Sequence, residues 1–326
     1  MRKKLLEIRD LSVRYHAADG LVWAVNNVSL TLEEGETLGL VGETGAGKTT
    51  TALSLLRLLP KRTSEVHSEG IFLDGVNLLE LPEKEMCSIR GSKVAMIFQD
   101  PMTALNPLQR VGDQIAEVIE LHWNMSRQET AAKVDEIMES VGLPAERKEE
   151  YPHQFSGGQR QRIGIARALA VSPKFIVCDE PVSALDVSIQ AQILNLMQDL
   201  QEESGFTYLF ISHNLSVVKH ISDDIMVMYL GQVVEKAPKA DLFREPLHPY
   251  TRALLEAIPI PKLSSRNRQR EILQGEIKSP IEPPEECRFA GRCRYASEAC
   301  RRGVPPLREI RPDHFVACVR SEEGAI

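Results

Sequence analysis

The chain has 326 residues, with 39 Lys and Arg against 46 Asp and Glu, so its formal net charge is −7. This length allows one large domain with an appendage or two modest domains, and the acidic balance argues against a general affinity for nucleic acid. The apolar runs fall well short of the about 20 residues that a membrane helix needs. No apolar stretch follows the basic N-terminus, so we also predict no signal peptide and expect a cytoplasmic protein.

In chain order, the first elements are strands that lead into a helix. Alternating or β-branched apolar residues predict strands over Leu6–Tyr15, Ala24–Leu32 and Thr37–Val41. Leucines at helical spacing then predict a helix over Thr49–Leu59, which Pro60 ends.

A glycine-rich segment joins the third strand to this helix. It fits G-x-x-x-x-G-K-[ST], and the strand before it and the helix after it are the context that a phosphate-binding loop needs. Successive backbone N–H groups of such a loop cradle phosphate oxygens. Lys48 would add positive charge at the β- and γ-phosphates, and the Thr49 hydroxyl would bind Mg²⁺. The predicted loop and helix N-terminus comprise Gly42, Glu43, Thr44, Gly45, Ala46, Gly47, Lys48, Thr49 and Thr50.

Strands and helices alternate through the rest of the first 260 residues. Further strands are predicted over Ile71–Leu73, Lys93–Phe98, Phe175–Cys178, Tyr208–Ser212, Ile225–Tyr229 and Gln232–Glu235, and helices over 111–141, Gln159–Ala170 and Gln190–Glu202. This alternation predicts an α/β fold with a mostly parallel sheet. Ligands of such sheets bind at the carboxyl ends of the strands, where Gly42, Asp179 and His213 stand.

An acidic pair ends the strand at 175–178. Asp179 would hold Mg²⁺ through water, and Glu180 would orient and deprotonate the attacking water. Two solvated carboxylates at a strand end are the alternative interpretation, which the apolar strand before them and Pro181 after them disfavour.

Ser156-Gly157-Gly158-Gln159 opens a predicted helix about 20 residues before this pair. The arrangement resembles the signature of ABC-type ATPases. The resemblance implies a P-loop NTPase (RecA-like) core with an antiparallel β edge and a helical ABC subdomain at about 100–158. It also implies that Ser156, Gly157, Gly158 and Gln159 of one subunit bind the γ-phosphate of ATP held by another, with two ATP molecules sandwiched between two such domains.

The resemblance assigns roles to three more residues. Tyr15 would stack on adenine, Gln99 would contact Mg²⁺ or water and sense the transport partner, and His213 would contact the γ-phosphate. Each has a structural alternative: a core aromatic, a polar surface residue and a strand-end histidine, respectively. Ser183-Ala184-Leu185-Asp186 matches the D-loop, and Phe155 stands where the family usually has Leu. The predicted catalytic residues are Lys48, Gln99, Glu180 and His213.

Longer motifs resemble the ATP-binding subunits of oligopeptide, dipeptide and nickel importers. They are Ile97–Pro107, Tyr151–Gly158, Ala184–Gln192 and His248–Thr251. The resemblance implies a peripheral ATPase at the cytoplasmic face of the inner membrane. Its partners would be two multi-span permease subunits, a second identical or related ATP-binding subunit, and an extracytoplasmic solute-binding protein. An importer for nickel or another small solute stays open, as does a soluble ABC ATPase acting on nucleic acid or ribosomes.

Beyond Pro259-Ile260-Pro261 the composition becomes charged, Pro-rich and Cys-rich. We therefore predict an ATPase domain over 1–260 and a Cys-rich extension over 261–326. The extension holds Cys287, Cys293, Cys300 and Cys318, whose C-x5-C-x6-C-x17-C spacing is wider than that of common zinc sites. Four thiolates could hold a 4Fe–4S cluster or Zn²⁺. The extension resembles the tail of dipeptide-importer relatives that holds such a cluster, so we expect a metal here, with structural free thiols as the alternative.

Overall fold

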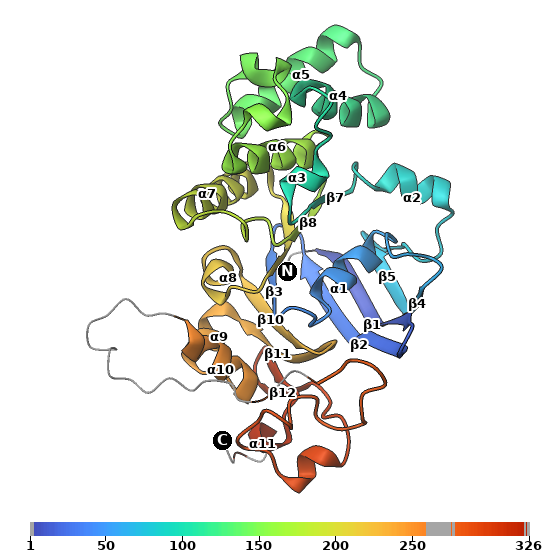
Figure 1. The fold of residues 1–326 in the computed structure, drawn as a ribbon, viewed down its shortest axis with the longest axis vertical. Helices are drawn as coiled ribbons and strands as arrows, with labels where there is room; N and C mark the ends of the chain where they lie inside the picture. Colours follow the sequence, from blue (N-terminus) through green and yellow to red (C-terminus); the bar gives the residue numbers. More distant parts are fainter. Residues whose placement is uncertain (1–2, 259–274, 276–277, 323, 325–326) are drawn as a thin grey trace, which may run out of the picture. The chain divides into compact units, whose positions relative to one another are not determined.

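The computed structural model describes residues 3–258, 275, 278–322 and 324, and Figure 1 shows them in sequence colours. They form two compact units, each described by itself. The P-loop unit comprises Glu7–Thr31, Leu38–Phe72 and Ser212–Ile326, and the signature unit comprises Met1–Leu6, Leu32–Thr37 and Leu73–Ile211. The predicted boundary at 260/261 lies outside the described residues and stays a prediction.

The P-loop unit contains an N-terminal antiparallel sheet, drawn in blue in Figure 1. Its strand order is β2-β1-β5, and β4 pairs antiparallel with β1. Buried and exposed side chains alternate along β1 and β2, which is why the period-2 pattern predicted both. The strands are β1 (Lys4–Ala17), β2 (Gly20–Glu33), β4 (Ser64–His67) and β5 (Gly70–Leu73).

A second sheet of this unit supports the glycine-rich loop. β3 (Thr37–Val41) pairs parallel with β10 (Asp224–Tyr229), and β10 pairs antiparallel with β11 (Gln232–Pro238). β11 pairs with β13 (His314–Val316), which pairs with β12 (Arg308–Arg311). The C-terminal segment therefore extends the sheet that starts at β3.

The helices of the P-loop unit are short. Helix α1 ends at Leu55 rather than at the predicted Leu59, because Arg57 adopts a left-handed conformation (φ 52°) that a right-handed helix cannot continue. The helices are α1 (Lys48–Leu55), α8 (Leu215–Ile221), α9 (Lys239–Arg244), α10 (Pro249–Ala257), η4 (Glu298–Arg301) and α11 (Val319–Glu322).

The signature unit has parallel strands and most of the larger helices. β8 (Phe175–Asp179) lies between β7 (Val94–Ile97) and β9 (Thr207–Ser212) and pairs parallel with both. All residues of β8 and β9 are buried, as expected for apolar strands of a parallel sheet. The other elements are β6 (Val76–Asn77), α2 (Glu83–Ile89), α3 (Pro101–Ala104), α4 (Val111–His122), α5 (Arg127–Ser140), η1 (Ala145–Glu149), η2 (Pro152–Gln154), α6 (Gly157–Leu169) and α7 (Val187–Ser204).

The predicted helical stretch 111–141 is two helices, α4 and α5, which contact each other and α6. They are the green helices labelled in Figure 1. Ser126 starts α5, because its side chain accepts from the Glu129 N–H while the Glu129 carboxylate accepts from the Ser126 N–H. No helix in the described part of the chain is long and apolar enough to cross a membrane.

Candidate nucleotide site

The glycine-rich loop lies between β3 and α1, against other backbone of the P-loop unit. A Cβ atom on Gly42 would lie 2.2 Å from the Met228 carbonyl oxygen, and one on Gly47 would lie 2.4 Å from that of Ala24. Gly47 also has φ 99°, which residues with a side chain rarely adopt. Close contact with β2 and β10 thus requires glycine at both positions.

Lys48 is buried at the start of α1, with 5% of its surface exposed. Its Nζ donates to the carbonyl oxygens of Gly42 (2.8 Å) and Glu43 (3.1 Å), so the ammonium group lies against the loop backbone. The Tyr15 hydroxyl donates to Thr50 Oγ1 at 3.4 Å. The structure therefore brings Tyr15 together with the predicted loop residues Gly42–Thr50. His213, in the same unit, is exposed between β9 and α8.

In the signature unit, the acidic pair and Gln99 come together. Asp179 ends β8 and is 5% exposed, whereas Glu180 is half-buried. Gln99 Nε2 donates to Glu180 Oε2 at 3.3 Å. The Glu180 N–H donates to the Ile211 carbonyl at 3.0 Å while its backbone has φ 47°. A left-handed conformation at a non-glycine residue costs about 1–3 kcal/mol, so this carboxylate is held at a strained position.

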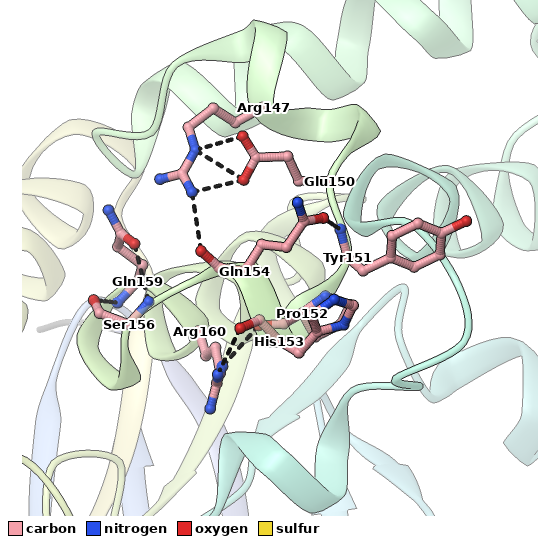
Figure 2. Close-up of polar contacts among 9 residues, drawn as sticks. All are labelled: Arg147, Glu150, Tyr151, Pro152, His153, Gln154, Ser156, Gln159 and Arg160. Carbon is pink, nitrogen blue, oxygen red and sulfur yellow. Dashed lines mark hydrogen bonds and ion pairs between the residues drawn. The ribbon is translucent and has the colours of Figure 1, made fainter.

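The signature residues form the N-terminal cap of α6 (Figure 2). Ser156 Oγ accepts from the Gln159 N–H at 3.4 Å, and Gln159 Oε1 accepts from the Ser156 N–H at 3.0 Å. The helix begins at Gly157, two residues before the predicted start. Unpaired N–H groups at the start of a 13-residue helix attract anions, so the cap stays the predicted second phosphate site.

Polar contacts hold the segment that enters this cap. Arg147 forms a bidentate pair with Glu150 and donates to the Gln154 carbonyl, and Arg160 donates to the carbonyls of Pro152 and His153 (Figure 2). Phe155 is 2% exposed, and the Arg147 guanidinium lies 4.1 Å from its ring centroid. The bulkier Phe155 is therefore accommodated as a buried cation–π partner.

The predicted D-loop residue Asp186 is the N-cap of α7, which starts three residues before its predicted position. Its carboxylate accepts from the Ile189 N–H at 3.0 Å. Ile189 in turn leaves no room for a side chain at position 158, because a Cβ on Gly158 would lie 2.5 Å from Ile189 Cγ2. The signature glycine is thus required by packing against the first turn of α7.

Sequence reasoning missed two residues at the phosphate-binding loop. The Tyr250 hydroxyl accepts from the Glu43 N–H at 2.9 Å, and Arg292 pairs with the Glu43 carboxylate. Tyr250 belongs to the His248–Thr251 motif, which indicated only a family resemblance. Arg292 carries no local signal, because its partner lies 249 positions away in the sequence.

The predicted metal site of the tail is not supported. All six cysteines are free thiols, and the described residues contain no group of three or more His, Cys, Asp or Glu side chains that could hold a metal ion. Burial, together with the neighbouring thiols of Cys300, Cys318 and Cys293, raises the pKa of Cys287 to about 12.

Three features together are typical of a P-loop ATP-binding cassette. They are a glycine-rich loop with a buried lysine, an acidic strand end whose glutamate accepts from a glutamine, and a capped glycine helix. Residues 25–183 match the ABC transporter family, and residues 234–300 match the oligopeptide/dipeptide transporter C-terminal region. The chain belongs to the ABC transporter family, as an ATPase of its oligopeptide/dipeptide branch.

Three relatives illustrate this membership. The "Probable peptide ABC transporter ATP-binding protein" of Sinorhizobium fredii is 46% identical, over 98% of this chain and 96% of its own. The oligopeptide transport ATP-binding protein AppF of Bacillus subtilis is 45% identical, over 97% of each chain. The dimeric structure of an ATP-binding cassette with ADP and Pi has a TM-score of 0.64 and 26% identity, covering 72% of this chain and 98% of its own.

Proposed function

We propose that the chain is the ATP-hydrolysing subunit of a membrane importer for di- and oligopeptides. The observation that carries the proposal is the 45–46% identity to proteins named for peptide and oligopeptide transport, over 97–98% of the chain. A match that included only the cassette would support ATP hydrolysis alone. The additional match of residues 234–300 to a peptide-transporter region supports this class of solute.

The proposed mechanism assigns each group a step. Loop N–H groups and Lys48 bind the β- and γ-phosphates, Tyr15 stacks on adenine, and His213 contacts the γ-phosphate. Mg²⁺, when bound, neutralises charge on the phosphates, and Thr49, Gln99 and the buried carboxylate of Asp179 are the oxygen donors that suit it. Glu180, oriented by Gln99, takes a proton from the attacking water.

The capped N-terminus of α6 is proposed to act on a second subunit. Its unpaired N–H groups would bind the γ-phosphate of ATP held by an identical or related chain, closing a two-site dimer. Hydrolysis would reopen the dimer and drive two membrane permease subunits, which receive peptide from an extracytoplasmic binding protein. The chain would then lie at the cytoplasmic face of the membrane as a peripheral subunit.

The test is peptide uptake by the chain assembled with its permease subunits in proteoliposomes. We expect ATP-dependent uptake, and Glu180→Gln should lower both hydrolysis and uptake more than about 100-fold, because a general base contributes about 10²–10⁴-fold. The variant should still bind ATP and accumulate as an ATP-bound dimer. Glu203→Gln, at an exposed site of α7, is the matched control and should be as active as the wild type.

Different results would point to other functions. Recovery of the native chain with ribosomes or nucleic acid, and not with permease subunits, would favour a soluble ABC ATPase. Uptake of nickel or another small solute in place of peptides would change the substrate class. Stoichiometric iron or zinc in chain purified without oxygen would show that the tail cysteines hold a metal.

A further inference from the structure

The C-terminal segment reaches the phosphate-binding loop within the P-loop unit. Arg292 Nη1 lies 2.7 Å from Glu43 Oε2, and Nη2 lies 3.2 Å from Oε1, so the pair is bidentate. The Arg292 side chain is only 8% exposed and that of Glu43 28% exposed. This partly buried ion pair is screened less by water and salt than a surface pair.

An aromatic cluster fixes the segment that carries Arg292. The buried ring of Phe289 packs against Tyr229 and Tyr250, with centroid distances of 5.3 Å and 5.4 Å. Tyr250 is the residue whose hydroxyl accepts from the Glu43 N–H, and Arg292 Nη1 also donates to the Tyr229 hydroxyl at 3.3 Å. The tail therefore contacts both the side chain of Glu43 and the tyrosine that holds its backbone.

Arg288 supports the loop from a second direction. It donates to the Leu230 carbonyl at 3.2 Å, at the turn between β10 and β11. In the same turn the Gly231 N–H donates to the carbonyl of Ala46, inside the loop, at 3.0 Å. One tail segment thus braces the loop directly and through this turn.

The negative charge of Glu43 is neutralised by Arg292. Glu43 is a carboxylate within the loop that must bind the phosphates of ATP, and it repels them, since like charges at short range cost free energy that falls with distance and dielectric constant. The Glu43 hydrogen bond raises the pKa of Arg292, so this guanidinium stays charged. Its charge cancels that of Glu43.

We propose that Arg292 is a positioning residue of the ATP site, which neutralises Glu43 and fixes the phosphate-binding loop, so that the C-terminal segment sets the affinity for ATP. The inference rests on the proposed function, because it presumes that this loop binds ATP. It assigns the tail a role in nucleotide binding.

The test is equilibrium binding of MgATP to the full-length chain. Arg292→Ala should raise Kd about tenfold, or about 1.4 kcal/mol. The double variant Glu43→Gln/Arg292→Ala should recover most of the loss, because no carboxylate is then left unpaired. Arg311→Ala is the matched control: this tail arginine also pairs with a glutamate through both nitrogens, but Arg311 and Glu245 are 44% and 54% exposed. Its Kd should change less than twofold.

Two results would overturn the proposal. One is an Arg292→Ala chain that unfolds at the wild-type temperature and binds MgATP with unchanged Kd. The other is failure of Glu43→Gln to restore binding, which would indicate packing rather than charge. If Arg292→Ala does not fold, the single variant Glu43→Gln decides. The charge of Arg292 is then not neutralised, so this variant should bind MgATP more tightly than the wild type. Weaker binding would refute the proposal. A wild-type chain that bound no MgATP would instead refute the proposed function.

Discussion

At the scale of single residues, His248 combines burial with a backbone role. Its ring Nδ1 accepts from the Tyr250 N–H at 3.1 Å at the start of α10, and its own N–H donates to Glu235 Oε2 at 3.0 Å. Burial lowers the pKa of His248 from 6.5 to about 4, although the nearby Glu235 opposes the shift. The folded chain thus holds this imidazole neutral.

This depressed pKa predicts acid sensitivity. Below pH 6.5 the unfolded histidine binds a proton that the folded one rejects, so stability falls as the pH falls from 6.5 toward 4. Between pH 7 and pH 5 the loss from this group should be about 2 kcal/mol. We expect His248→Asn, which can still cap α10 but does not titrate, to lose that much less in urea unfolding at the two pH values. Equal pH dependence in both chains would contradict the assignment.

Residue identities at the nucleotide site could be predicted where they belong to short motifs. The loop through Lys48, the pair Asp179–Glu180 and the cap at Ser156 are local patterns with a mechanism. Tyr250 and Arg292 could not be predicted, because their roles depend on contacts across about 200 positions or more. The left-handed backbone of Glu180 could not be predicted from the sequence either, because it accompanies a hydrogen bond to β9.

At the scale of elements, α6 offers a paired test of why glycine occupies the signature. Gly158→Ala would place a methyl group 2.5 Å from Ile189 Cγ2, whereas Gly164→Ala meets nothing within 4 Å. We expect the first substitution to destabilise the chain by about 1–3 kcal/mol, as overpacking does, and to lower ATPase activity. The second should stabilise it by about 0.5–1 kcal/mol, because alanine favours helix.

Thermal unfolding and steady-state ATP hydrolysis of the two variants measure these effects. Equal stability of the two would mean that Ile189 moves aside and that packing does not select this glycine.

Strands were predicted better than helices. β3 has its predicted bounds because the run between two polar turns, apolar after Thr37, is too short for a helix. The helices α8, α9 and α10 were not predicted, because each is too short for its apolar positions to establish a helical period. The predicted start of α7 was late because Asp186 was read as a motif residue and not as a cap.

At the scale of the whole molecule, a buried hydrogen bond ties the C-terminal segment to β11 within the P-loop unit. His314 Nε2 lies 2.7 Å from Glu235 Oε1, with side chains 2% and 0% exposed. Glu235 also accepts from the backbone N–H of Leu247. The tail residues Val316 and Cys318 pack with Leu247 in a small apolar cluster beside this pair.

We predict that His314→Ala destabilises the chain by about 1–3 kcal/mol, because it removes a buried hydrogen-bond partner of the Glu235 carboxylate. Arg308→Ala is the control, since the Arg308 side chain is 62% exposed in its pair with Glu322 and surface pairs contribute about 0–1 kcal/mol. Urea unfolding of the full chain measures both. A similar small effect for the two variants would show that the His314–Glu235 pair adds no stability.

The composition shift after residue 261 predicted a Cys-rich extension, but it did not indicate how that extension packs. Cysteine counts do not reveal that β13 pairs with β11 or that His314 supplies the polar anchor. The P-loop and the signature, in contrast, indicate the family from the sequence alone, because each motif follows from the chemistry of holding phosphate.

The left-handed backbone at Glu180 has a consequence for engineering this chain. Glycine adopts such a conformation without the steric cost that a side chain brings, so replacing this glutamate relieves strain while removing the proposed base. Selection for thermal stability alone would therefore favour inactive variants at this position. Engineering a more thermostable variant would require measuring ATP turnover as well as melting temperature in every round of selection.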